Sequence, residues 1–78
     1  MERYHGRSRR AKLFYGNLLI PLLKDQDQDV RSSAAQLLGH MGKSAKVAVP
    51  DLIPLLKDQD ENVRFVAEEA LKKLGYKP

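Results

Sequence analysis

The residue types that carry out chemistry in enzymes occur in this chain, but their spacing builds no reaction centre. The candidate nucleophiles have no evident basic partner, and they are Ser8, Ser32, Ser33 and Ser44. Carboxylates gather mainly in two short polar segments, and no glycine-rich loop that could cradle a phosphate is present. The absence of cysteine removes disulfides and thiolate metal ligands. We therefore expect no enzyme, with no catalytic or cofactor-binding residues.

The N-terminal stretch is strongly basic and could contact phosphates. The net charge of +4 equals the excess within residues 1–12, where five basic side chains accompany one acidic side chain. Contacts of this kind give nonspecific nucleic-acid binding that weakens steeply with salt. The residues that would make them are Arg7, Arg9, Arg10 and Lys12. No base-reading motif accompanies them, so we favour a flexible basic arm over residues 1–10 and keep nucleic-acid binding as an alternative.

The rest of the chain is an internal repeat. Residues 19–27 (LIPLLKDQD) return as residues 52–60, which are nine identical residues at an offset of 33. A fixed period of this length is typical of proteins built from stacked repeats. We expect one domain over residues 11–78, made of two repeats (11–42 and 44–75) and a short C-terminal tail.

Apolar residues recur at helical spacing, and no segment alternates as a strand would. The second helix of each repeat is marked by Val30, Ala34, Leu37, Leu38 and Met41, and by Val63, Ala67, Ala70, Leu71 and Leu74. Ser44 is a plausible cap for the first helix of the second repeat. The sequence therefore predicts an all-α fold of two stacked helical hairpins with about four helices.

Prolines and glycines mark where these helices bend and stop. Pro21 in the first repeat, and Pro50 and Pro54 in the second, remove backbone donors inside the first helix of each hairpin, so we expect bends there. Gly42 and Gly75 follow the two second helices, where a glycine commonly ends a helix in the left-handed conformation.

Both repeats carry a recognisable motif over residues 19–75. The second reads Ala48-Val49-Pro50-x-Leu52-Ile53-x-Leu55-Leu56-x-Asp58-x-Asp60-x-x-Val63-Arg64-x-x-Ala67-x-x-Ala70-Leu71-x-x-Leu74-Gly75, and the first matches it from Leu19 to Gly42. This motif resembles the HEAT repeat, in its short form called the phycobilisome-lyase-type (PBS lyase) HEAT-like repeat. The resemblance implies an α-solenoid fragment, in which antiparallel helix pairs stack and the second helices line a concave side.

The resemblance also implies that arginines bond to the acidic turns. The residues concerned are Arg31 and Arg64, with Asp25, Asp27, Asp58 and Asp60 as their candidate partners. The residues themselves agree, because an arginine one turn into a helix can bond to carboxylates in the preceding loop. We interpret these pairs as structural.

Metal binding is not expected. HEAT-like hydroxylases that hold iron use His-Glu pairs, whereas His5 is followed here by Gly6 and His40 by Met41. His40 is expected on the exposed side of its helix end, where a partial positive charge suits the helix dipole.

One face of the fourth helix offers an aromatic side chain to a partner. Glu61, Phe65, Glu68 and Lys72 lie opposite the predicted core on a helical wheel. Aromatic residues are enriched where proteins bind one another. The equivalent face of the second helix includes Ser32, Ala35 and Gly39, which are small enough to let another helix approach. We expect these residues to bind a helix or peptide.

Two repeats are fewer than a stable stack generally needs, which is about three. We therefore expect the open ends to be covered by a second copy in a homodimer, or by a larger partner. The sequence thus predicts a non-catalytic protein-interaction scaffold. The alternatives are a subunit or fragment of a bilin lyase and nucleic-acid binding through the arm. No apolar run reaches the length of a membrane span or a signal peptide, so a cytoplasmic location is expected.

Overall fold

The computed structural model describes residues 18–77, and all its regular elements are helical. In chain order they are η1 (Ile20–Lys24), α2 (Gln28–Met41), η2 (Gly42–Ala48), α3 (Val49–Leu52), η3 (Ile53–Lys57) and α4 (Glu61–Lys73), where η denotes a 3₁₀ helix. Residues 18–77 contain no strand. The all-α prediction is therefore confirmed. No helix in this range is long and apolar enough to cross a membrane.

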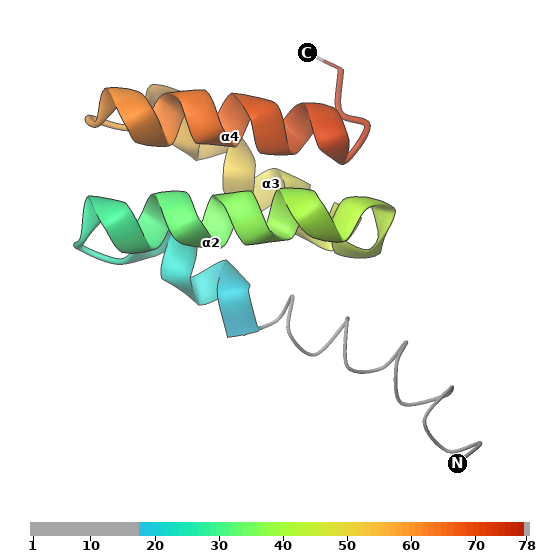
Figure 1. Ribbon diagram of the computed structural model, residues 1–78, viewed down its shortest axis with the longest axis horizontal. Helices are drawn as coiled ribbons and strands as arrows, with labels where there is room; N and C mark the ends of the chain where they lie inside the picture. Colours follow the sequence, from blue (N-terminus) through green and yellow to red (C-terminus); the bar gives the residue numbers. More distant parts are fainter. Residues whose placement is uncertain (1–17, 78) are drawn as a thin grey trace.

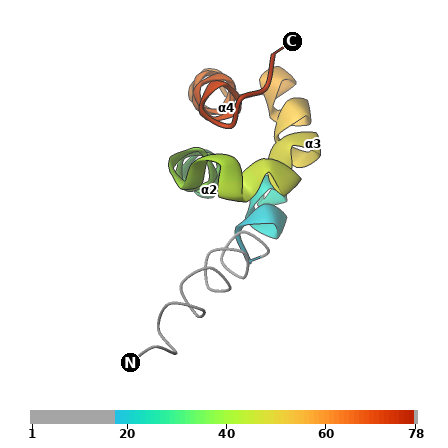
Figure 2. The same ribbon diagram turned by 90° about the vertical axis from the view of Figure 1, so that its right-hand side faces the viewer.

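The elements form two hairpins placed next to each other. In the first, η1 packs against α2, and in the second, η3 and to a lesser extent α3 pack against α4, while η2 lies against α2. The two long helices, α2 and α4, lie side by side and form the main contact between the hairpins (Figure 1). An end-on view shows α2 and α4 in one layer and α3 with its neighbours in a second layer (Figure 2).

The second layer consists of short helical pieces because prolines interrupt it. Pro21 and Pro54 each stand near the start of a five-residue 3₁₀ helix, and Pro50 stands near the start of the four-residue α3. A proline cannot donate the backbone hydrogen bond that continues an α-helix. The prolines thus coincide with short α and 3₁₀ pieces in place of one continuous α-helix. Ser44, in contrast, lies inside η2 and makes no capping bond, so its prediction as a helix cap was wrong.

The long helices are bounded by side-chain caps and glycines. The side chain of Asp27 accepts a hydrogen bond from the backbone N–H of Asp29, and that of Asp60 accepts one from Val63. These bonds satisfy donors that a helix start leaves without intrahelical partners. Gly42 (φ 64°) and Gly75 (φ 87°) follow the helix ends, and both have the positive φ that a glycine there was expected to adopt. The ψ of Gly42 is −144°, which lies outside the predicted left-handed helical region.

The core lies between the two layers. Its largest fully buried side chains are Leu23, Leu38, Leu52, Val63 and Leu74. Leu37 was expected in this core but is 51% exposed. Helix α2 already turns one side towards η1 and another towards α4. Leu37 lies on the remaining flank, so a single apolar stripe was too simple a description of α2.

Candidate functional site

The two long helices approach each other closely at a pair of small residues. A Cβ atom placed on Gly39 would lie 2.9 Å from the Cα of Ala70, which is closer than real Cβ contacts come. Ala35, one turn before Gly39, has no exposed surface, and Ser32 is 9% exposed. The helix that these small residues admit is therefore α4 of the same chain. Our expectation that Ser32 and Ala35 present an open face to a partner was wrong, because both are buried. Gly39 is also buried and lies against Ala70 of α4, but it borders the groove described next.

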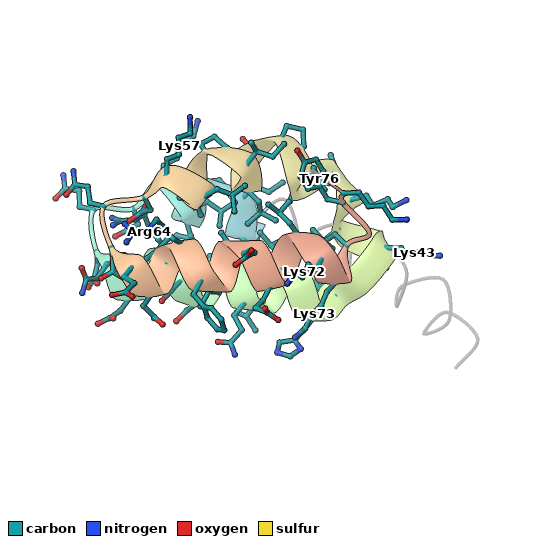
Figure 3. The ribbon with its side chains drawn as sticks, turned by 90° about the horizontal axis from the view of Figure 1, so that it is seen from above. Lys43, Lys57, Arg64, Lys72, Lys73 and Tyr76 are labelled. Carbon is teal, nitrogen blue, oxygen red and sulfur yellow. The ribbon has the colours of Figure 1, made fainter. Side chains whose placement is uncertain are left out.

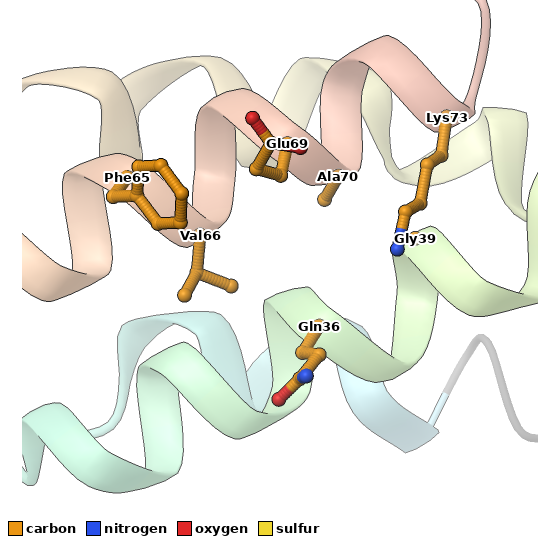
Figure 4. A pocket seen from close by; sticks show the side chains of 7 residues that line it. All are labelled: Gln36, Gly39, Phe65, Val66, Glu69, Ala70 and Lys73. Atoms are coloured by element: carbon orange, nitrogen blue, oxygen red, sulfur yellow. The ribbon is translucent and has the colours of Figure 1, made fainter.

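A groove runs along the outer side of this contact. It has a volume of about 170 Å³ and is lined from α2 by Gln36 and Gly39, and from α4 by Phe65, Val66, Glu69, Ala70 and Lys73 (Figure 4). Pockets for drug-sized molecules are usually about 300–1,000 Å³. The groove is therefore of a size for one anchoring side chain and not for a whole small molecule.

Phe65 is the main apolar surface of the groove. It is 58% exposed, as the sequence predicted for its face of α4, and Val66 beside it is half-buried. Glu69 and Lys73 supply one negative and one positive charge along the same side of α4 (Figure 4). The groove thus joins an aromatic anchor to a polar rim, which is the usual composition of a protein-binding surface.

The other predicted residues of that face are exposed, but they do not all border the groove. Glu68 and Lys72 flank a separate hollow of about 100 Å³, on the side of α4 that faces away from α2, lined also by Leu56, Leu71 and Tyr76. Glu61 lies near Phe65 at the start of the helix, in a shallow and open region.

Sequence reasoning missed the groove residues Gln36, Val66, Glu69 and Lys73. A signal for some of them was available. Glu69 and Lys73 follow Phe65 at intervals of four, which places all three along one side of a helix. What the spacing could not show is where α2 packs, and this decides which flank of α4 becomes a groove.

The hairpins are joined by an ion pair between their turns. Nε of Arg31 donates to Oδ2 of Asp58 at 2.9 Å, and Nη2 donates to Oδ1 at 3.0 Å. Nη1 of Arg31 donates to the backbone carbonyls of Asp25 and Gln26, at 2.8 and 3.0 Å. One guanidinium therefore holds its own turn through carbonyls and the next turn through a carboxylate.

The environment of this pair explains its protonation. The side chains of Arg31 and Asp58 are 16% and 8% exposed. The hydrogen bond from Arg31 lowers the pKa of Asp58 below its usual value, and burial opposes this to a smaller extent. The same hydrogen bond raises the pKa of Arg31. The pair is consequently charged at neutral pH.

The remaining acidic turn residues have local roles. Asp25 accepts from the N–H of Asp27 at 2.8 Å, and Asp27 and Asp60 cap helices. Arg64 donates from Nη1 to the carbonyls of Asp58 and Gln59. Within residues 18–77 it forms no ion pair, which differs from the expected bond to a turn carboxylate. The structural interpretation of the motif holds for Arg31, although its carboxylate partner lies in the other repeat.

Two further predictions concern metal and nucleic acid. His40 is exposed in the last turn of α2, and residues 18–77 contain no cluster of three side chains that could hold a metal ion. The residues of the basic arm, Arg7, Arg9, Arg10 and Lys12, lie outside the described residues.

Sequence comparison bears on the fold just described. A family model for HEAT repeats matches residues 16–78. The chain belongs to the HEAT-repeat family. No curated protein and no solved structure matches it. HEAT repeats generally mediate protein–protein interactions and are typically non-catalytic scaffolds. The finer resemblance to the phycobilisome-lyase type stays a prediction.

Proposed function

We propose that this HEAT protein is a non-catalytic interaction module that binds a helical peptide segment in the groove between α2 and α4. The observation that carries the proposal is the exposed ring of Phe65 at the edge of that groove. Side chains of this type, set in a concave surface, are the usual anchors of protein interfaces. The groove lies between two side-by-side helices, as in other cases where a helix is bound by helices.

The rim indicates what the bound segment should carry. Glu69 and Lys73 are one helical turn apart on α4, and Gln36 faces them from α2 (Figure 4). A bound helix with an apolar residue next to Phe65 and charges opposite in sign to Glu69 and Lys73 would satisfy all three positions. The apolar anchor supplies most of the affinity, and the charges select orientation.

The test begins with a peptide-display library of amphipathic helices selected on the intact protein. Affinities of the selected peptides are then measured by fluorescence anisotropy for the wild type, Phe65→Ala and Val47→Ala. Val47 is 61% exposed in η2 and lines none of the hollows described above, so it is a matched control for loss of an exposed apolar side chain. We expect Phe65→Ala to weaken binding at least about tenfold and Val47→Ala to leave it unchanged. Peptides that bind Phe65→Ala as tightly as the wild type would refute the groove.

We also propose that the protein associates with itself, because residues 18–77 hold only two repeats, fewer than the roughly three that a stable stack generally needs. Exposed apolar side chains occur on the first-repeat side at Leu22 and Leu37, which are 39% and 51% exposed. Sedimentation measured over a range of concentrations tests this part separately from peptide binding. A mass that stays at 8.8 kDa at every concentration would contradict self-association.

A further inference from the structure

The contact between the two repeats has counterparts at both ends of the molecule. At the turn end of the internal contact, Arg31 and Leu23 of the first repeat meet Asp58 and Leu55 of the second, and all four line one hollow. An offset of 33 converts Arg31 to Arg64, Leu23 to Leu56, and Leu22 and Asp25 to Leu55 and Asp58. The outer ends therefore carry the same residues as the internal contact, with an arginine and a leucine at one end and an aspartate and a leucine at the other.

The guanidinium of Arg64 is bonded to its own turn in the same way as that of Arg31. Nη1 of Arg64 donates to the carbonyls of residues 58 and 59, and Nη1 of Arg31 donates to those of residues 25 and 26. In Arg31 this arrangement directs Nε and Nη2 to the carboxylate of the next turn. Arg64 lies beside the turn that joins η3 to α4 (Figure 3). No residue among 18–77 accepts a hydrogen bond from its Nε or Nη2.

Asp25 mirrors this arrangement at the opposite end. Its Oδ1 accepts the N–H of Asp27 at 2.8 Å, as Oδ1 of Asp58 accepts that of Asp60 at 2.9 Å. The carboxylate of Asp58 also accepts two hydrogen bonds from the side chain of Arg31. Within residues 18–77, Asp25 has no such arginine. Its turn is built from the same nine residues, so the acceptor geometry is the same.

We propose that a second copy of this chain docks head-to-tail, with Arg64 of one copy bonded to Asp25 of the next. Leu56 of the first copy would meet Leu22 of the second, as Leu23 meets the region of Leu55 inside the chain. This proposal rests on the self-association part of the proposed function. A contact between two different faces does not close on itself at two copies, so it builds linear chains or rings.

Away from the turns, the proposed interface between copies differs from the internal contact between α2 and α4, and this difference weakens the interface. Gly39 and Ala70 touch inside the chain, whereas the equivalent positions of two docked copies are Lys72 and Leu37. These larger side chains hold the helices of neighbouring copies farther apart than α2 and α4. The joint between copies therefore buries less apolar surface and depends more on the arginine–aspartate pair. We expect association that weakens as salt is added.

Charge exchange on the full-length protein tests the arrangement. Arg64→Glu places two carboxylates at the joint, and Asp25→Arg places two guanidinium groups there, so each variant alone should remain at 8.8 kDa in sedimentation. An equimolar mixture restores opposite charges at every joint, and its mass should rise with concentration as that of the wild type does. Lys43→Glu changes a charge at the other end of the molecule from Arg64 (Figure 3) and should assemble normally.

Three results would overturn the proposal: a monomeric wild type, assembly of either single variant, or a mixture that stays monomeric. Association of the wild type that these substitutions leave intact would refute the head-to-tail joint but keep self-association. Peptide binding by the groove is measured separately and is unaffected by any of these results.

A cross-linking experiment keeps the proposal testable if Arg64→Glu fails to fold. The chain has no cysteine, so Leu22→Cys and Leu56→Cys can be mixed as two otherwise native proteins. Head-to-tail docking predicts a disulfide between the two variants and little between identical copies. Cross-links confined to identical copies would instead show a symmetric contact and refute the arrangement.

Discussion

Arg31 and Asp58 bond through two parallel hydrogen bonds of 2.9 and 3.0 Å, across a sequence separation of 27 residues. The contact ties the second helix of one repeat to the turn of the next repeat. It stands beside Leu23 and Leu55, which are 1% and 7% exposed, so the ion pair closes one end of the shared core.

Removing this guanidinium should cost more than removing its counterpart in the second repeat. Arg31→Gln leaves the carboxylate of Asp58 almost buried without its cation, and it also frees two turn carbonyls. Arg64→Gln frees only two turn carbonyls. Urea unfolding of both variants should therefore give a lower free energy of unfolding for Arg31→Gln. Equal losses would mean that the ion pair between the repeats adds nothing.

The ion pair also predicts a dependence of stability on acid. The pKa of Asp58 is lower in the folded protein than its ordinary value because Arg31 donates to it. Its contribution to stability is complete above the ordinary aspartate pKa of about 4, and it is lost as the pH falls through the lower folded value. The difference in unfolding free energy between the wild type and Asp58→Asn should be constant from about pH 5 to 8 and shrink below about pH 4. A difference that grows in acid would contradict the assignment.

Gly39 is required by packing and not by its own backbone. Gly39→Ala would by itself favour the helix by about 1 kcal/mol. The new methyl group would meet the backbone of Ala70 at 2.9 Å, and overpacking of this kind costs about 1–3 kcal/mol. We expect a net loss of about 1 kcal/mol in thermal or urea unfolding. Gln36→Ala, on the exposed side of α2, should stay within about 0.5 kcal/mol of the wild type.

The start of α4 depends on the side chain of Asp60. Its Oδ2 accepts the backbone N–H of Val63 at 3.0 Å. Asp60→Ala should lower the free energy of unfolding by about 1 kcal/mol, whereas Asp60→Ser keeps an acceptor and should recover most of the loss. An alanine variant as stable as the serine variant would show that the cap does not contribute.

The nine repeated residues and the spacing of Val63, Ala67 and Leu71 were enough to predict two helical hairpins, because periodicity records which residues face a core. They were not enough to predict how the hairpins meet. Gly39 was assigned to an open face because its small size indicates only that a helix approaches, without saying which helix.

The partner of Arg31 could not be found from sequence for a related reason. The motif offers aspartates in both turns at equivalent positions, and local reasoning favours the nearer one. Only the packing of α2 on α4 brings the turn of the second repeat within reach. The same packing determines which flank of α4, beside Phe65, is open as a groove.

The most direct test of the interaction module is to map where a selected helical peptide binds, using the backbone amide NMR signals of the intact protein. Binding in the groove predicts the largest shifts at Gln36, Gly39 and residues 65–70, with little change around Val47. Shifts centred on Leu56 and Tyr76, or spread along η2 and α3 with none near Phe65, would contradict it.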